Sequence, residues 1–262
     1  MIPSQAQTTP AHGIMARPHV ALRDVGLLRG GRPVLQSLSL SVPLDRRVVI
    51  LGPNGAGKSL LLHLVQGLIA PDLGSLTMHL PSGDKPAGRS EPGRSEPSAR
   101  LAFVFQRPVM LRRSAQGNIE HALALAGVPA RQRQERALAA LRRVGLEDAA
   151  QRPARRMSGG EQQRLALARA HALAPVALLL DEPTASLDPG AAAGIERELL
   201  RIAEEGTGLL MATHDLAMAR RLATDIVFLH RGKVLAQGAA RQCLDEPADP
   251  ILRRFLAGQW LE

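Results

Sequence analysis

The pattern of apolar positions predicts two antiparallel strands near the beginning of the chain. Residues 20–25 and 37–42 are strand-like, and in the second segment apolar residues alternate with serines. Such alternation is typical of a strand that buries one face and exposes the other. Because Gly30 and Gly31 stand between the two segments and favour a turn, we predict that the strands form a hairpin.

A second pattern, short apolar runs without polar interruption, predicts strands that are buried on both faces of a parallel sheet. Residues 48–51 form one such run, and the apolar segment 60–66 is expected to be helical. Further runs of this kind occupy residues 176–180, 209–212 and 226–229. Since strands that alternate with helices build parallel β/α units, we predict an α/β fold.

Residues 107–156 interrupt this alternation and are expected to be helical. Ala137 and Leu141 fall on one face of a helix whose other positions are rich in arginine. A further helix is predicted after Ser158. We therefore expect a helical subdomain, inserted into the α/β core at about residues 107–160.

Two segments contain too few apolar residues to offset the entropy cost of ordering. Residues 1–17 are polar and interrupted by prolines, and we expect a disordered leader in which translation starts at Met1 or at Met15. Residues 81–99 contain the sequence GRSEP twice, back to back. We predict a disordered insert between two strands there, with a regulatory docking loop as the alternative.

Composition restricts the class of protein further. Apolar residues make up 45% and aromatic residues 2% of the 262 positions, so the core is expected to be aliphatic. No apolar run approaches the roughly 18 residues that a membrane helix needs, and residues 1–17 lack the apolar centre of a signal peptide. The single cysteine, Cys243, excludes an internal disulfide and a cysteine-based zinc site. These features predict a cytoplasmic protein that does not itself cross a membrane.

The formal net charge of the chain is +9, and only three of the 33 basic residues are lysines. An excess of basic residues is compatible with nucleic acid or an anionic membrane surface as a partner. However, no basic run is longer than two residues, and none is interleaved with aromatic residues as in proteins that bind single strands. We interpret the excess as a compositional bias and expect no nucleic-acid partner.

The sequence GPNGAGKS at residues 52–59 fits the phosphate-binding pattern GxxxxGK[ST], with an apolar strand before it and a helix after it. Glycines allow the backbone to turn its N–H groups towards phosphate oxygens, and the start of a helix adds a positive dipole. Lys58 is expected to neutralise the β- and γ-phosphates, and the Ser59 hydroxyl to bind Mg²⁺. The residues expected to contact ATP here are Gly52, Pro53, Asn54, Gly55, Ala56, Gly57, Lys58, Ser59 and Leu60.

Two adjacent carboxylates follow the strand predicted at residues 176–180. Asp181 stands at the carboxyl end of that strand, where open α/β sheets bind their ligands. We expect Asp181 to hold Mg²⁺ through water and Glu182 to polarise the attacking water as a general base. An apolar strand followed by Asp-Glu is weak support by itself, but together with the phosphate-binding loop it indicates a nucleotide-hydrolysing site.

Five motifs together resemble those of the ATP-binding cassette (ABC) ATPases. They are GPNGAGKS at residues 52–59, Gln106, MSGGEQQR at 157–164, LLLDEPTASLD at 178–188 and THD at 213–215. The resemblance implies a P-loop NTPase cassette with a parallel core sheet, an antiparallel β subdomain and an inserted helical subdomain. On this basis the ABC ATPase domain is expected at residues 18–240, followed by a C-terminal tail at residues 241–262.

The resemblance also implies that two cassettes face each other head to tail and enclose ATP between them. Ser158, Gly159 and Gly160 of one cassette would then contact the γ-phosphate held by the other, whereas the alternative for this segment is a simple serine-capped helix. Gln106 would contact Mg²⁺ and couple to the membrane partner. His214 would contact the γ-phosphate as a catalytic residue beside Glu182 and Lys58.

The chain departs from the family pattern at three places. It contains no tyrosine, and Leu28 or Arg29 occupies the region in which the family places an aromatic residue that stacks on adenine. A guanidinium group can stack on a ring, so Arg29 is the candidate replacement. The signature has Met157 instead of leucine and Glu161 where glutamine is frequent, and the insert at residues 81–99 lengthens a loop.

The resemblance implies an ATPase subunit that powers the import of a small solute through a separate membrane permease. Residues 105–114 resemble the corresponding stretch of importers of phosphate, tungstate or molybdate, which makes an oxyanion the candidate solute. The implied partners are the permease, a second cassette in a homodimer and an extracytoplasmic solute-binding protein, with the chain peripheral at the cytoplasmic face of the inner membrane. The alternatives are an exporter or lipoprotein-release ATPase, and a soluble ABC protein that acts on ribosomes or DNA.

Overall fold

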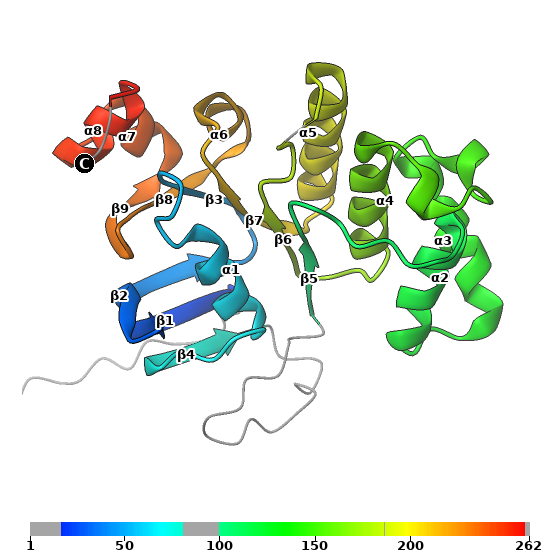
Figure 1. Cartoon of the computed structure of the whole chain (residues 1–262), viewed down its shortest axis with the longest axis horizontal. Helices are drawn as coiled ribbons and strands as arrows, with labels where there is room; N and C mark the ends of the chain where they lie inside the picture. Colours follow the sequence, from blue (N-terminus) through cyan, green and yellow to red (C-terminus); the bar gives the residue numbers. More distant parts are fainter. Residues whose placement is uncertain (1–16, 81–99, 186, 260–262) are drawn as a thin grey trace, which may run out of the picture.

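A six-stranded sheet forms the centre of the structure (Figure 1), a computed structural model that describes residues 17–80, 100–185 and 187–259. Its strand order is β5-β6-β7-β3-β8-β9, and only β9 runs antiparallel to its neighbour. The strands are β3 (Arg47–Leu51), β5 (Leu101–Val104), β6 (Ala177–Asp181), β7 (Gly208–Thr213), β8 (Asp225–His230) and β9 (Lys233–Ala239). Every residue of β6 and β7 is buried, which confirms that the continuous apolar runs mark a parallel core sheet.

A smaller antiparallel sheet lies beside the core sheet (Figure 1), with the strand order β2-β1-β4. Its strands are β1 (His19–Arg29), β2 (Arg32–Pro43) and β4 (Leu73–His79). The predicted hairpin is confirmed, because β1 and β2 pair along their length up to Arg29 opposite Arg32. The apolar pattern did not reveal β4, because most of its residues are exposed and it has no continuous apolar run.

Two hydrophobic cores form on opposite faces of the six-stranded sheet. Strand β3 contributes to both, since Val48 and Ile50 pack in one core while Val49 and Leu51 pack in the other. The first core also contains the small sheet and helix α1 (Lys58–Gln66). The second contains α4 (Gly159–His171), α5 (Pro189–Glu204) and α6 (Leu216–Leu222). Successive side chains of a strand point to opposite faces, so a sheet covered on both sides needs this division.

A helical region, residues 115–171, lies at one end of the core sheet (Figure 1). It comprises α2 (Ala115–Leu125), α3 (Ala130–Arg143), the short 3-10 helices Glu147–Ala149 and Ala154–Arg156, and α4. Helix begins only at Ala115, so the prediction of helix from residue 107 is wrong for residues 107–114. The reason is local, because Ser114 caps α2 by accepting a hydrogen bond from the Gly117 N–H, and Pro108 disfavours helix at the residue before it.

The chain after residue 239 forms two further helices, α7 (Ala240–Asp245) and α8 (Pro250–Leu256). The tail that we expected after residue 240 therefore contains helix. Phe255 of α8 packs against Phe228 of β8 with ring centroids 5.3 Å apart, which anchors this end of the chain on the sheet. Cys243 of α7 is buried, as expected for a small apolar residue.

Two expectations concern residues outside the described part of the chain. They are the disordered leader, except for its last residue, and the disordered insert at residues 81–99, which follows β4 and precedes β5. Within the described ranges, none of the helices combines the length and the apolar character that crossing a bilayer requires.

Candidate nucleotide-binding site

The loop between β3 and α1 requires glycine at two positions because of its backbone path. Gly52 lies so close to β8 that a Cβ atom would come within 2.1 Å of the Leu229 carbonyl oxygen. Gly57 has a φ angle of 105°, in the left-handed region that favours glycine. Both glycines of the sequence pattern are therefore needed to fold the loop, whatever ligand it binds.

Helix α1 begins where this loop ends and has no side-chain cap. Its N-cap residue is Gly57, and no acidic residue stands in its first turn. The first N–H groups of a helix lack partners within the helix, and the helix dipole makes this end positive. Asn54 and Gly55 of the loop are exposed, so loop and helix start together offer an accessible cradle for an anion such as phosphate.

The Lys58 ammonium group is buried over the loop instead of extending into solvent. Its Nζ donates hydrogen bonds to the carbonyl oxygens of Gly52 at 2.8 Å and Pro53 at 3.1 Å, and lies 4.0 Å from Oε1 of Glu182. Burial lowers the pKa of Lys58, while the carboxylates of Glu182 and Asp181 act in the opposite direction. The arrangement places one cationic group directly beside the anion cradle.

Ser59 and Asp181 join the start of α1 to the end of β6. The Ser59 hydroxyl donates a hydrogen bond to Oδ1 of Asp181 at 2.9 Å, and burial raises the pKa of Asp181 against the effect of that bond. Hydroxyl and carboxylate oxygens are ligands that Mg²⁺ prefers, so this pair fits that metal. Among the described residues, no group of three His, Cys, Asp or Glu side chains could hold a metal ion.

Glu182 follows Asp181 in a strained backbone conformation. Its φ angle of 47° lies in the left-handed region, which is uncommon for a residue with a side chain. Its carboxylate contacts two groups at the end of β7. Oε2 accepts a hydrogen bond from the Thr213 hydroxyl at 3.1 Å, and Oε1 lies 2.8 Å from Nδ1 of His214. Strain of this kind concentrates at functional sites, where surrounding contacts fix a side chain in one position.

Thr213 belongs to this group of side chains, although the sequence analysis gave it no role. Its hydroxyl donates to Glu182 and accepts a hydrogen bond from the Asp215 N–H at 3.0 Å. Spacing along the sequence gave no signal for this role, because the role depends on which strand lies next to β7. Thr213 is the last residue of a strand that pairs in parallel with β6, so it lies at the same edge of the sheet as Asp181.

Within the described part of the chain, the remaining predicted residues form no hydrogen bond with this group. Gln106 is exposed just after the edge strand β5, and within the described ranges no hydrogen bond joins it to Ser59 or Asp181. Arg29 is exposed at the tip of the β1–β2 hairpin. Ser158 and the two glycines after it lie at the N-terminus of α4, in the helical region.

Ser158 caps helix α4 through a reciprocal pair of hydrogen bonds. Its Oγ accepts from the Glu161 N–H at 3.3 Å, and its own N–H donates to the Glu161 carboxylate at 2.7 Å. The serine-capped helix, which we considered as the alternative for this segment, is therefore present, and the glycine pair does not prevent it. Ser158 and Gly159 are exposed, so this helix start is accessible to a second molecule.

Comparison with known proteins places this site in a family. A family model described as ABC transporter matches residues 35–185. The chain is 35% identical to the phosphate import ATP-binding protein PstB 2 of Natronomonas pharaonis, over 98% of this chain and 92% of that protein. It is 38% identical to the tungstate uptake system ATP-binding protein TupC of Peptoclostridium acidaminophilum, over 78% of this chain and 91% of that protein.

A further relative and a solved structure agree with this match. The histidine/lysine/arginine/ornithine transport ATP-binding protein HisP of Escherichia coli is 33% identical, over 87% of this chain and 93% of that protein. The structure of cbiO1 from Clostridium perfringens, part of the ABC transporter complex cbiONQ, superposes with a TM-score of 0.75 at 26% identity, covering 87% of this chain and 90% of that one.

Proposed function

The chain belongs to the ABC transporter family of ATPases, and we propose that it powers the import of a small solute through a separate membrane permease. The observation that carries the proposal is the meeting of the phosphate-binding loop with Ser59, Asp181 and Glu182 at one edge of the core sheet. Relatives named for phosphate import, tungstate uptake and amino-acid transport support import as the direction.

The loop and the start of α1 would bind the phosphates of ATP. Backbone N–H groups of the loop, with the exception of Pro53, which has none, would donate to the β-phosphate, and Lys58 would exchange its carbonyl partners for β- and γ-phosphate oxygens. Ser59, Asp181 and Gln106 would hold Mg²⁺, which when bound neutralises phosphate charge and orients the γ-phosphate. Arg29 would stack its guanidinium on the adenine ring.

Glu182 would act as the general base of hydrolysis. The bond that forms joins the water oxygen to the γ-phosphorus, and the bond that breaks joins that phosphorus to the oxygen bridging to the β-phosphate. Glu182 accepts the proton that the water loses, and Thr213 and His214 hold its carboxylate in place. His214 would contact the γ-phosphate as well.

A second copy of the chain would complete the site in a homodimer. The exposed start of α4, with Ser158, Gly159 and Gly160, supports this proposal, because exposed N–H groups at a helix start suit a γ-phosphate. ATP would then lie between the phosphate-binding loop of one copy and this helix start of the other. Hydrolysis would release the two copies from each other.

The permease would dock beside Gln106, at the cytoplasmic face of the membrane. Two apolar side chains next to it are unusually exposed, Phe105 at 41% and Val109 at 68%, which supports a binding surface there. The relatives named for phosphate and tungstate favour an oxyanion as the solute, delivered by an extracytoplasmic solute-binding protein.

Capture of partners from native membranes tests this function. The Glu182→Gln variant is expected to bind ATP without turning it over, so it should hold the transporter in its assembled state in ATP and Mg²⁺. We expect mass spectrometry to find a multi-span permease and a solute-binding protein, both reduced when nucleotide is omitted. Recovery of only soluble, ribosomal or nucleic-acid-bound partners would contradict the transport function and leave the ATPase activity unaffected.

A further inference from the structure

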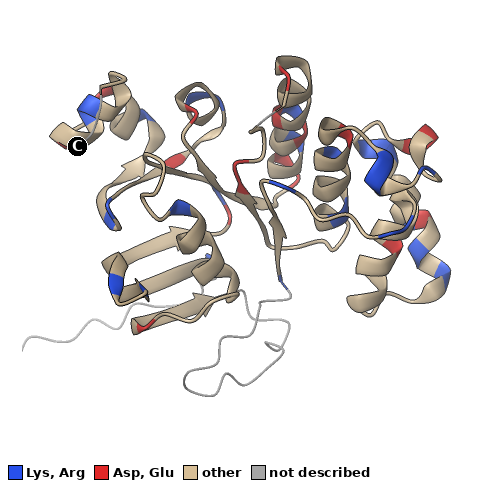
Figure 2. Ribbon diagram, viewed as in Figure 1, with Lys and Arg blue, Asp and Glu red and all other residues tan. Residues whose placement is uncertain are grey.

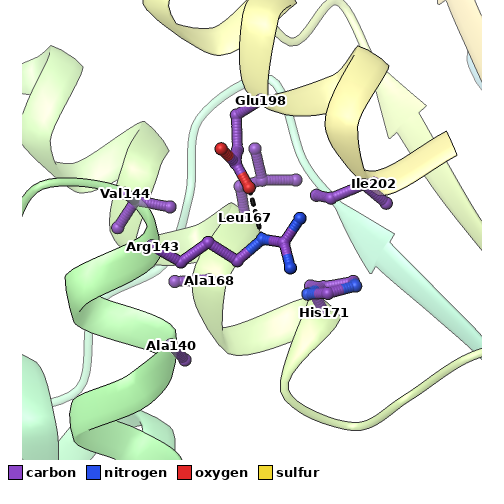
Figure 3. Close-up of a pocket in the computed structure, with 8 residues that line it drawn as sticks. All are labelled: Ala140, Arg143, Val144, Leu167, Ala168, His171, Glu198 and Ile202. Atoms are coloured by element: carbon purple, nitrogen blue, oxygen red, sulfur yellow. Dashed lines mark hydrogen bonds and ion pairs between the residues drawn. The ribbon is translucent and has the colours of Figure 1, made fainter. Parts of the chain in front are cut away.

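The helical region meets the core at a junction of three helices. Figure 3 shows α3, α4 and α5 surrounding a small pocket whose wall is mostly aliphatic. Ala140 and Val144 line it from the end of α3, Ala168 from α4 and Ile202 from α5. Small side chains leave a gap between the three helices within the larger apolar core, so a polar contact across the gap adds to the orientation that apolar packing sets.

One arginine side chain spans this junction and donates hydrogen bonds to two glutamates. Arg143 is the last residue of α3, and its Nε donates a hydrogen bond to the Glu198 carboxylate of α5. Its Nη1 donates to Oε2 of Glu205, immediately after α5, at 2.7 Å. The two glutamates are seven residues apart, which is about two helical turns. The planar guanidinium that contacts both of them therefore fixes the position of the end of α3 along α5 and its orientation relative to that helix.

The contact between Arg143 and Glu205 favours the charged form of both groups. Hydrogen bonding to Glu205, together with Glu198, raises the pKa of Arg143, and the same contact lowers the pKa of Glu205. The Glu198 side chain is 7% exposed, and its other charged neighbour, Arg201, lies at 3.6 Å on the same helix. Loss of Arg143 would therefore leave a buried carboxylate without its main partner.

No second described residue of α2 or α3 makes a contact of this kind. Among residues of α2 and α3, all of which the structure describes, Arg143 is the only one whose hydrogen bonds reach α5. The neighbouring Arg142 also forms an ion pair, but its partner Glu147 lies within the helical region. The two adjacent arginines are both ion-paired and differ in exposure, 65% for Arg142 and 25% for Arg143, and only Arg143 connects the helical region to α5.

We propose that Arg143, Glu198 and Glu205 form a clamp that sets the angle between the helical region and the core. Helix α4 packs against α3 and is capped by Ser158, so the clamp determines where that exposed helix start points. Arg143 is therefore a positioning residue for the ATPase reaction, and this part of the inference rests on the proposed homodimer. With the clamp broken, each copy still binds ATP, but Ser158 meets the partner's nucleotide less often.

The test compares Arg143→Gln with its neighbour Arg142→Gln in the full chain. For Arg143→Gln we expect kcat to fall at least about 10-fold, within the range of coupling between sites in proteins. Binding of a fluorescent ATP analogue to the single chain should change by less than about two-fold. Arg142→Gln should leave kcat and nucleotide affinity at the wild-type values. An unchanged kcat for Arg143→Gln would overturn the inference.

A second variant separates positioning from simple stabilisation. In Arg143→Gln/Glu198→Gln a neutral amide replaces the buried carboxylate, so most of the thermal stability lost in the single variant should return. The clamp is still absent, so kcat should stay low. Recovery of kcat together with stability would show that Arg143 only stabilises the fold, which would also overturn the inference.

Amide hydrogen exchange tests the clamp independently of ATPase activity. Arg143→Gln should speed amide exchange in α3 and in the first turn of α4, and Arg142→Gln should not. If the wild-type chain hydrolyses no ATP, the proposed function fails, and the exchange data alone decide whether Arg143 holds the junction. Identical exchange in wild type and Arg143→Gln would contradict the clamp.

Discussion

At the residue scale, Glu182 is the point at which the contacts of the site converge. Its backbone is held at a φ angle of 47°, and its carboxylate meets Thr213, His214 and, at 4.0 Å, the ammonium group of Lys58. These contacts come from two places in the fold, the end of β7 and the start of α1. A side chain held by three neighbouring groups suits a base that must meet a water molecule in one geometry.

Removal of the Glu182 charge should stop hydrolysis without stopping ATP binding. Glu182→Gln keeps the size of the side chain but loses the proton acceptor, so we expect kcat to fall by about 100-fold or more. Glu196→Gln is the matched control, because both glutamate side chains are 12% exposed and ion-paired, and Glu196 pairs with Arg221 away from the site. Normal steady-state turnover of Glu182→Gln would rule out its role as the base.

In the absence of nucleotide, the negative charge of Asp181 should reduce the stability of the protein. Burial raises its pKa in the folded state, so the protonated carboxyl group favours folding below the usual pKa of 3.8, and that contribution is lost as the pH rises through the raised pKa and the group becomes charged. We expect Asp181→Asn to be more stable than wild type by about 1 kcal/mol at pH 7. This advantage should shrink as the pH falls towards 3.8. Urea unfolding across this range measures it, and an advantage independent of pH would contradict the charge explanation.

At the scale of elements, the site depends on the junction between a strand and a helix. Strand β3 ends at Leu51, the loop passes β8 at Gly52, and α1 begins at Lys58. The loop is closely packed on one side, against Leu229, and open at Gly55, where a Cβ atom would have nothing within 4 Å. The glycines of one motif therefore differ in what they do.

Alanine substitutions should separate these roles. Gly52→Ala would force a Cβ atom against backbone, and we expect the free energy of unfolding to fall by about 3 kcal/mol. Gly55→Ala meets open space and only its φ angle of 79° opposes it, so the loss should be about 1 kcal/mol. Denaturant unfolding of both variants measures the difference. Equal losses of unfolding free energy would show that the close approach of Gly52 to Leu229 does not affect stability.

The elements that the sequence predicted are those with strong periodicity or a complete motif. The buried strands β3, β6, β7 and β8 and the β1–β2 hairpin follow directly from the apolar pattern. The loop at residues 107–114 was missed because its arginines and Leu111 resemble the helix that follows, and only the cap at Ser114 separates them. Thr213 was missed as a site residue because its role depends on which strand lies next to β7, and topology is not visible in spacing.

At the scale of the whole molecule, positive charge gathers around the helical region. Residues 107–171 contain thirteen arginines and five acidic residues, and Figure 2 shows basic segments along this end of the structure. Two segments that contain exposed arginines lie side by side, one with Arg112 and Arg113 and the other with Arg155 and Arg156. The Ala154 N–H donates to the Arg113 carbonyl, and Arg155 donates to the Met110 carbonyl, each at 3.0 Å.

These exposed arginines should strengthen assembly with the permease through charge. The triple variant Arg112→Gln/Arg113→Gln/Arg156→Gln is expected to bind the permease roughly 10-fold more weakly at low salt, since exposed ion pairs contribute up to about 1 kcal/mol each. The difference should shrink at high salt because screening weakens the wild-type interaction. Surface-immobilised permease and purified variants would measure both values.

A second triple variant controls for the loss of charge itself. Arg23, Arg32 and Arg241 are exposed as well but belong to β1, β2 and α7. Their replacement by glutamine should leave the affinity for the permease and its dependence on salt unchanged. If both triple variants weaken binding equally, the effect belongs to net charge and not to the surface beside residues 107–113.

The division of β3 between two cores has a consequence for how the protein melts. Each core takes alternate side chains from this strand, and its last residue leads into the phosphate-binding loop. Neither layer can come apart without disturbing the other, so both belong to one cooperative unit. A ligand that binds only the native loop raises the stability of that entire unit. ATP is therefore expected to delay heat denaturation of the small antiparallel sheet together with the parallel one, although its phosphates are held elsewhere.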